Sequence, residues 1–259
     1  MAERTGYPDG APCWVELATP DAAAVSGFYA GLFGWTCQDQ GEEFGHYTMC
    51  SLDGRAVAAI SPAQGAPPAG APSSYWSVYL ATSDVDAGAA TVEANGGKLL
   101  APPMDVPGFG RFAYATDPTG AAFGLWQAGP FSGAQLHDEP GALCWSEVTT
   151  TDGAAADTFY RALFGYEQEQ TGDGAAFDYT VWRIGGTEVC GRLQMDENWA
   201  GIAPHWMAYF AVPDCDAAVR RVTELGGALG YGPFDTPHGR MAVVSDPAGA
   251  HFTLCRRPG

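Results

Sequence analysis

The chain has 259 residues, of which 46% are hydrophobic, and its 30 acidic residues outnumber 12 basic ones to give a net charge of −18. This acidic balance excludes nucleic acid and anionic membrane as partners, because both need a basic contact surface. The sequence has no apolar run of about 18 residues and no apolar leader core, and its seven cysteines contain no CxxC pair. We therefore expect a cytoplasmic monomer or homodimer with reduced cysteines, which binds a small uncharged or weakly charged molecule.

Taken in chain order, the first half reads as an alternation of strands and helices. Asp21 is a plausible helix N-cap, and Gly34 is a plausible residue just beyond the helix end. A Pro/Gly/Ala-rich stretch at 62–72 reads as a linker. The predicted elements are a strand at 12–19, a helix at 21–32, strands at 47–52 and 56–60, a strand at 75–81, a helix at 84–94, and strands at 111–115 and 122–127.

The second half repeats the first, with an offset of 131 residues at the start of the repeat and 129 near its end. Residues 10–36 (GAPCWVELATPDAAAVSGFYAGLFGWT) match residues 141–167 (GALCWSEVTTTDGAAADTFYRALFGYE). The DPTG sequence at 117–120 returns as DPAG at 246–249. A period of this length is too long for a solenoid repeat and fits a duplicated domain.

Each half divides again into two copies of a strand–helix–three-strand module. We predict an α+β fold in which each domain pairs two βαβββ modules into a curved open sheet around a cleft. The predicted boundaries are domain 1 at 8–128 (modules 10–62 and 72–128), a linker at 129–140, and domain 2 at 141–258 (modules 141–196 and 203–257).

The helix end FYxxLFGW/Y and the final hairpin DPxG-x-x-F, together with the four modules, resemble the vicinal oxygen chelate superfamily. That superfamily includes glyoxalase I, extradiol dioxygenases, fosfomycin-resistance transferases and bleomycin-binding proteins. The stretch 102–129 resembles more closely the two-domain glyoxalase-like proteins of actinobacteria that are often labelled hydroxylases. The resemblance implies the fold and leaves the function open, because this fold hosts several chemistries.

The resemblance also implies where a divalent metal would be held, on the first and last strands of paired modules. In this chain those positions are Trp14, Trp145, Ser77, Met207, Gly124 and Thr253. None of these is a usual ligand for a divalent metal, and tryptophan and glycine side chains cannot serve at all. We therefore expect no metal and no other cofactor.

Tryptophans stand at several positions that the family topology turns toward the cleft. We predict a ligand-binding wall of Trp14, Trp76, Trp126, Trp145 and Trp206, although all five could equally be core residues. His205, His251, Arg111 and Arg240 are further ligand-binding candidates. His251 shares a strand face with Thr253 and Cys255. The last strands of the two halves differ, and the smaller residues around Gly124 suggest a roomier pocket in the first half.

Glu16 and Glu147 lie in the middle of apolar strands, where a carboxylate is costly unless it is paired or hydrogen-bonded. One interpretation is a structural ion pair within each domain, to Arg111 and Arg240 respectively. The other is a catalytic general base with a raised pKa. In that case Tyr47, Tyr79 or Tyr209 would be the hydrogen-bond donors.

Three functions follow from these residues. The first is a metal-free protein that binds a hydrophobic or aromatic metabolite or antibiotic, for sequestration, resistance or an accessory role in biosynthesis. The second is a metal-independent enzyme of secondary or xenobiotic metabolism, a lyase, isomerase, cyclase or hydroxylase-like protein with a glutamate base. The third is a metal-dependent glyoxalase or dioxygenase with displaced ligands.

Overall fold

The computed structural model describes residues 4–63, 72–175 and 177–258, so most of the predicted stretch 62–72 lies outside the described residues. The first half contains β1 (Pro12–Thr19), α1 (Ala22–Phe33), β2 (Thr36–Asp39), η1 (Glu42–Phe44), β3 (Thr48–Leu52), β4 (Arg55–Pro62), β5 (Tyr75–Ala81), α2 (Val85–Ala94), β6 (Lys98–Val106), β7 (Gly110–Thr116) and β8 (Ala122–Ala128). The second half contains β9 (Leu143–Thr150), α3 (Gly153–Phe164), β10 (Glu167–Gly172), β11 (Asp178–Ile184), β12 (Thr187–Gln194), η2 (Glu197–Trp199), β13 (His205–Ala211), α4 (Cys215–Glu224), β14 (Ala228–Thr236), β15 (Gly239–Ser245) and β16 (His251–Arg256).

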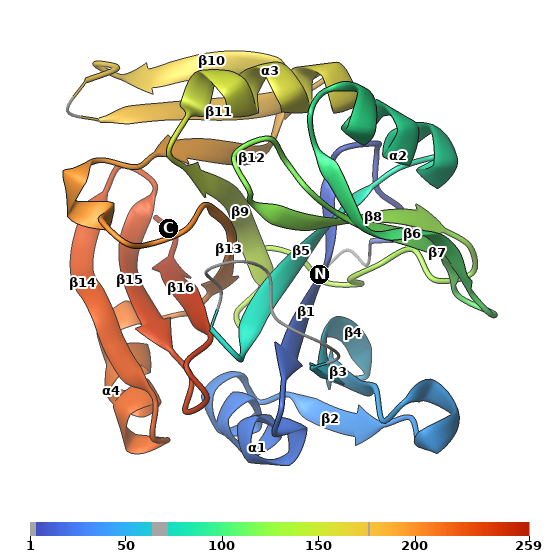
Figure 1. Cartoon of the computed structure of the whole chain (residues 1–259). Helices are drawn as coiled ribbons and strands as arrows, with labels where there is room; N and C mark the ends of the chain where they lie inside the picture. Colours follow the sequence, from blue (N-terminus) through green and yellow to red (C-terminus); the bar gives the residue numbers. More distant parts are fainter. Residues whose placement is uncertain (1–3, 64–71, 176, 259) are drawn as a thin grey trace.

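The strands form two eight-stranded sheets with the same topology, which confirms the predicted α+β fold of tandem modules (Figure 1). The first sheet has the order β2-β3-β4-β1-β5-β8-β7-β6, and the second has the order β10-β11-β12-β9-β13-β16-β15-β14. In each sheet the two modules meet where their first strands pair antiparallel, β1 with β5 and β9 with β13. Each sheet stays open, because its two outermost strands do not pair with each other.

An aspartate begins each of the four helices, and a glycine ends the two longer ones. The Asp21 side chain accepts a hydrogen bond from the backbone N–H of Ala24, and Asp84, Asp152 and Asp214 cap their helices in the same way. Gly34 follows α1 in the left-handed conformation with φ of 75°, which a glycine adopts without steric cost. The helix boundaries are therefore set locally by the sequence.

The helices of the two halves pack against each other across one shared core. Helix α1 lies beside α4 at one end of the molecule, and α2 lies beside α3 at the other (Figure 1). The Arg221 side chain on α4 donates to the backbone oxygen of Gly31 on α1 at 3.2 Å. The largest buried cluster combines apolar side chains from both sheets and both sets of helices. The two halves are therefore joined by core packing as well as by the connecting chain.

A buried hydrogen-bond chain also crosses between the halves. Trp76 Nε1 donates to the Tyr29 hydroxyl at 3.1 Å, and this hydroxyl donates to Asp246 Oδ2 in the second half at 3.0 Å. Asp246 belongs to the repeated DPxG turn. Its carboxylate also stabilises this turn by accepting a hydrogen bond from the backbone N–H of Ala250 at 2.9 Å. The turn motif therefore fixes a hairpin and anchors the opposite half at once.

No helix among the described residues combines the length and apolar character needed to cross a lipid bilayer. The longest helices, α1 and α3, have 12 residues each, whereas a bilayer-spanning helix needs about 20.

Candidate functional site

Strand alternation gives each sheet two faces, one packed on the helices and one turned away from them, which we call the helix-free face. On β1, Val15 and Leu17 enter the shared core, so Trp14 and Glu16 point to the helix-free face. On β9, Val148 is in the shared core, so Trp145 and Glu147 occupy the matching positions of the second sheet. The predicted pairing of a tryptophan and a glutamate on one face of each first strand is therefore present in both halves.

In both halves a tyrosine links this tryptophan to the glutamate. Trp14 Nε1 donates to the Tyr47 hydroxyl at 3.0 Å, and Tyr47 is hydrogen-bonded to Glu16. Trp145 Nε1 donates to the Tyr179 hydroxyl at 2.8 Å, and Tyr179 is hydrogen-bonded to Glu147. The repeat thus preserves a Trp–Tyr–Glu chain of hydrogen bonds. Its tyrosine in the first half, Tyr47, is one of the three that the sequence suggested as donors to the glutamates.

A second hydroxyl completes each glutamate site. Ser61 donates to Glu16 Oε1 at 2.9 Å, and Tyr209 donates to Glu147 Oε1 at 2.6 Å. Sequence reasoning named Tyr209 and missed Ser61 and Tyr179. Tyr179 is displaced by one residue from the position that the 131-residue offset assigns to Tyr47, so the repeat could not indicate it.

The carboxyl groups of both glutamates are held by uncharged donors alone. Burial raises the pKa of Glu147, and the hydrogen bonds from Tyr209 and Tyr179 offset this only in part. Burial likewise raises the pKa of Glu16 against the opposing hydrogen bonds from Ser61 and Tyr47. Glu147 is 5% exposed and Glu16 is half-buried, and desolvation disfavours the charged form of both carboxyls.

The predicted ion pairs from these glutamates to Arg111 and Arg240 are wrong. Arg111 pairs with Asp86 on α2 and with Asp105, and Arg240 pairs with Asp216 on α4 at 2.6 Å and with Asp235 at 3.0 Å. Both arginines sit on strands where the neighbouring alternate residues enter the shared core, so their side chains lie on the helix side of the sheet. This placement puts both arginines on the opposite side of the sheet from Glu16 and Glu147.

Of the two alternatives left open for Trp76 and Trp206, a cleft wall or the core, the structure places both side chains in the core. Trp76 is 6% exposed and Trp206 is 4% exposed, and both belong to the shared core between the halves. Trp206 Nε1 donates to the buried Tyr160 hydroxyl at 2.8 Å, just as Trp76 donates to Tyr29. The side chains of the neighbouring Ser77 and Met207 point to the helix-free face instead, because successive strand residues point to opposite sides.

The helix-free face of the first sheet is covered around Trp14. Residues after β8 fold back over it, with Phe131 meeting the Trp14 ring edge-on at 4.9 Å and the Ala134 N–H donating to the Cys13 carbonyl at 2.8 Å. Trp14 is consequently 4% exposed. Trp126 lies on this face, where its Nε1 donates to the Phe131 carbonyl at 3.0 Å. These tryptophans form part of a packed aromatic cluster.

In the first half a tyrosine ring fills the space beside Gly124, so the predicted roomier pocket does not lie at that position. A methyl group added to Gly124 would meet the Tyr79 ring at 2.0 Å. In the second half Trp145 and Tyr209 both remain partly exposed, and the buried cluster on that face is small, formed by Cys144, Ala211 and Cys255. Of the two matching tryptophans, Trp145 on the second sheet is therefore more accessible than Trp14 on the first.

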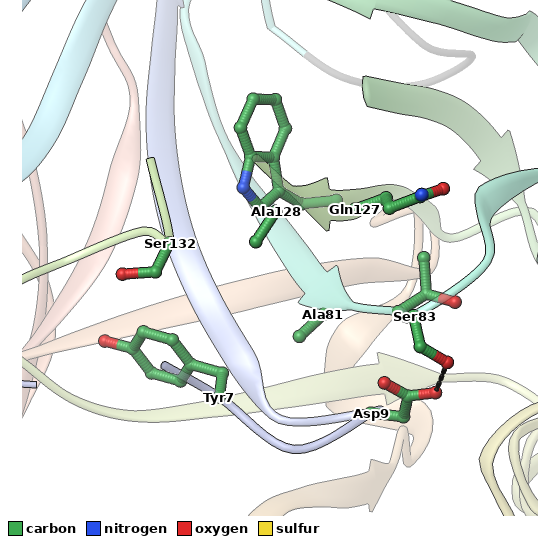
Figure 2. A pocket seen from close by; sticks show the side chains of 9 residues that line it. Tyr7, Asp9, Ala81, Ser83, Gln127, Ala128 and Ser132 are labelled. Carbon is green, nitrogen blue, oxygen red and sulfur yellow. Dashed lines mark hydrogen bonds between the residues drawn. The ribbon is translucent and has the colours of Figure 1, made fainter. Parts of the chain in front are cut away.

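A small cavity of about 210 Å³ lies where β5 and β8 end, and Glu16 is not among its lining residues (Figure 2). Figure 2 shows Tyr7, Ser132 and Gln127 around it, and the Ser83 hydroxyl donating to Asp9 at 2.6 Å. Its polar groups are already engaged, since Tyr7 donates to the Ala134 carbonyl and Gln127 accepts from the Val85 N–H. Sites for drug-sized ligands usually have about 300–1,000 Å³, so this cavity is too small for the expected ligand.

The two candidate histidines lie at the start of β13 and β16, which are parallel neighbours in the second sheet. His205 is half-buried, and its Nδ1 lies 2.8 Å from the Ala203 carbonyl. Burial lowers the pKa of His205, with a smaller effect from His251 nearby. His251 is exposed at the start of β16. The two histidines are thus near each other, and His205 favours the neutral form.

Comparison with known proteins follows the same division into halves. Residues 13–125 match the model of the Glyoxalase/Bleomycin resistance protein/Dioxygenase superfamily, and residues 145–255 match that of the Glyoxalase-like domain. The anthracycline biosynthesis protein DauV of Streptomyces sp. (strain C5) is 43% identical over 96% of this chain and 94% of its own length. The chain belongs to the glyoxalase superfamily.

Two further relatives of this superfamily member bear on its fold and its setting. The anthracycline biosynthesis protein DnrV of Streptomyces peucetius is likewise 43% identical, over 96% of this chain and 94% of its own. The Mn(II)-bound glyoxalase from Novosphingobium aromaticivorans has a TM-score of 0.66 at 17% identity, covering 95% of this chain and 82% of that one. At this identity the solved structure supports the shared fold alone.

The side chains at the family's metal positions do not fit a metal ion in this superfamily member. Trp14 donates to Tyr47, Ser77 is hydrogen-bonded to Tyr114 at 2.8 Å, and the Tyr79 ring covers Gly124. In the second half, Trp145 donates to Tyr179, and neither Met207 nor Thr253 is a usual ligand. Across the described ranges, no three His, Cys, Asp or Glu side chains are grouped to hold a metal.

Proposed function

We propose that this glyoxalase superfamily member binds a planar, hydroxyl-bearing aromatic metabolite without a metal, on the helix-free face of the second sheet. The observation that carries the proposal is the Glu147 carboxyl, which is held only by tyrosine hydroxyls beside the partly exposed Trp145 and Tyr209. Aromatic rings supply the apolar contact area, and a carboxyl in this setting accepts a hydrogen bond from a phenolic hydroxyl.

The net charge of −18 supports an uncharged ligand, because a polyanion would be repelled. The two Streptomyces relatives are named for anthracycline biosynthesis. Anthracyclines contain a planar, fused ring system with phenolic hydroxyls, which is the shape and chemistry that this face suits. We therefore place the protein in secondary metabolism, in an accessory role of carrying or sequestering such a compound.

A titration of intrinsic tryptophan fluorescence with quinizarin, a planar dihydroxyanthraquinone, tests this site. Base–aromatic stacking is worth about 1–3 kcal/mol, so Trp145→Leu should weaken binding roughly 5-fold to more than 100-fold. The repeat supplies the matched control, because Trp14→Leu removes the same ring and the same hydrogen bond to a tyrosine under a covered surface. The control should change the dissociation constant less than about twofold.

Near-UV circular dichroism should first show that both leucine variants are folded. Equal weakening by the two substitutions would contradict a site on the second sheet. Loss of binding only in Trp14→Leu would move the site to the first sheet.

The raised pKa of Glu147 favours one second candidate, a metal-independent enzyme that uses this carboxyl as a general base. A base must accept a proton near neutral pH, and burial moves the carboxyl in that direction. In that case Glu147→Gln should abolish conversion of a bound ligand while leaving its dissociation constant within about threefold. Product analysis by mass spectrometry separates the two candidates, because a carrier returns its ligand unchanged.

A further inference from the structure

Two cysteines face each other across the β2–β3 hairpin. Cys37 on β2 and Cys50 on β3 are direct partners in the antiparallel register, and their sulfur atoms are 2.8 Å apart. Directly opposed residues in antiparallel strands have Cα atoms about 4.5–5.5 Å apart, within the range of about 4.4–6.8 Å that a disulfide spans. The sulfurs are also closer than two non-bonded sulfur atoms ordinarily come, so the backbone places them for bond formation.

The two thiols differ in their access to solvent. Cys37 is half-buried, whereas Cys50 has no exposed surface and belongs to the shared core. The hydrogen bond from Cys50 lowers the pKa of the Cys37 thiol. Because the thiolate is the reactive form, Cys37 can meet an oxidant from solvent and Cys50 can then close the bond from below.

We propose that Cys37 and Cys50 form a disulfide with hydrogen peroxide as the oxidant, and that a dithiol reductant reverses it. The Cys37 thiolate attacks one peroxide oxygen, the O–O bond breaks, and the hydroxide that leaves takes up a proton to become water. The resulting sulfenic acid at Cys37 is attacked by the Cys50 sulfur, which forms the S–S bond and releases a second water. Two thiols are thereby oxidised by two electrons, and one hydrogen peroxide is reduced.

The pair is specific to the first half. In the second half Gln168 and Trp182 occupy the matching register, and that hairpin has six paired positions instead of four. Arg183 further holds it through ion pairs to Glu169 and Glu188. The first-half hairpin carries Tyr47, the residue that hydrogen-bonds both Trp14 and Glu16. The disulfide would therefore cross-link β2 and β3, the strands of the shorter hairpin that positions Tyr47.

Treatment of the full chain with a small excess of hydrogen peroxide tests the proposal. Intact mass should fall by about 2 Da, titratable thiols should drop from seven to five, and peptide mapping should recover residues 37 and 50 in one cross-linked species that dithiothreitol separates. Hydrogen exchange in β2 and β3 should slow on oxidation, while exchange in β10 and β11 stays unchanged.

Cys37→Ser is the control variant, because its half-buried position tolerates the change better than the buried Cys50. It should keep six thiols under the same treatment. A second thiol pair, Cys144 and Cys255, lies in mutual contact in the second half, and mapping distinguishes it. Cross-linking of Cys144 to Cys255 alone, or oxidation of Cys37 to sulfinic acid with Cys50 left free, would overturn the proposal.

Discussion

Replacing Trp76 by alanine should lower the free energy of unfolding by about 3–5 kcal/mol, the usual cost of removing a large aromatic side chain from a core. The Trp76 ring packs against Tyr29 in the first half and Phe210 in the second, with ring centroids 5.4 and 5.1 Å apart. The cavity would therefore open between the halves. Chemical denaturation followed by far-UV circular dichroism and by tryptophan fluorescence measures the change.

The matched substitution Trp76→Phe keeps a ring and removes the donor to Tyr29, so it should cost about 1–2 kcal/mol. Because the core is shared, both probes should report one transition, and the substitution should shift the whole of it. Two separate transitions, with only one displaced by Trp76→Ala, would show that the halves unfold independently and that the shared core contributes little to their coupling.

Replacing Glu147 by glutamine should flatten the dependence of stability on pH. The carboxyl titrates near about 4.3 in the unfolded chain and at a higher pH when folded, since burial raises its pKa. The folded state therefore holds this proton more tightly, so its stabilising contribution is present below the unfolded pKa and is lost as pH rises through the folded pKa. Each unit of difference corresponds to about 1.4 kcal/mol.

At pH 4 and below, roughly where both states are protonated, Glu147→Gln and the wild type should therefore differ little. At pH 8 the variant should be the more stable of the two, because glutamine still accepts the hydrogen bond from Tyr209 without a buried charge. Urea denaturation across this pH range gives the comparison. Glu16→Gln provides a parallel test and should show the same trend, because burial also raises the pKa of Glu16. A variant destabilised equally at all pH values would contradict the raised pKa.

The fold could be predicted from the sequence because its signals are local and duplicated. The aspartate caps, the glycine after each of the two longer helices and the DPxG turns mark the element boundaries in both halves, and the 131-residue offset sets the number of modules. The edge strands β2 and β6 had no predicted range of their own, since edge positions lack the alternating apolar pattern that marks the inner strands.

The candidate site could be predicted only in part. Glu16 and Glu147 stand out because a carboxylate in an apolar strand needs partners, but several partners fit the sequence equally well. The assignment of Arg111 and Arg240 as partners of the glutamates failed because those side chains point to the other side of the sheet. Trp76 also points to that side, because it is one residue out of step with the positions on the helix-free face. The covering of Trp14 by Phe131 is a tertiary contact between distant segments, with no local signal.

The central claim, that an aromatic ligand binds on the second sheet without a metal, is tested most directly by calorimetric titration of quinizarin into chelator-treated, desalted protein. Metal content should be measured on the same sample. The account predicts one binding event per chain, with the same dissociation constant before and after chelation. Binding that disappears on chelation and returns when a divalent metal is restored would contradict it.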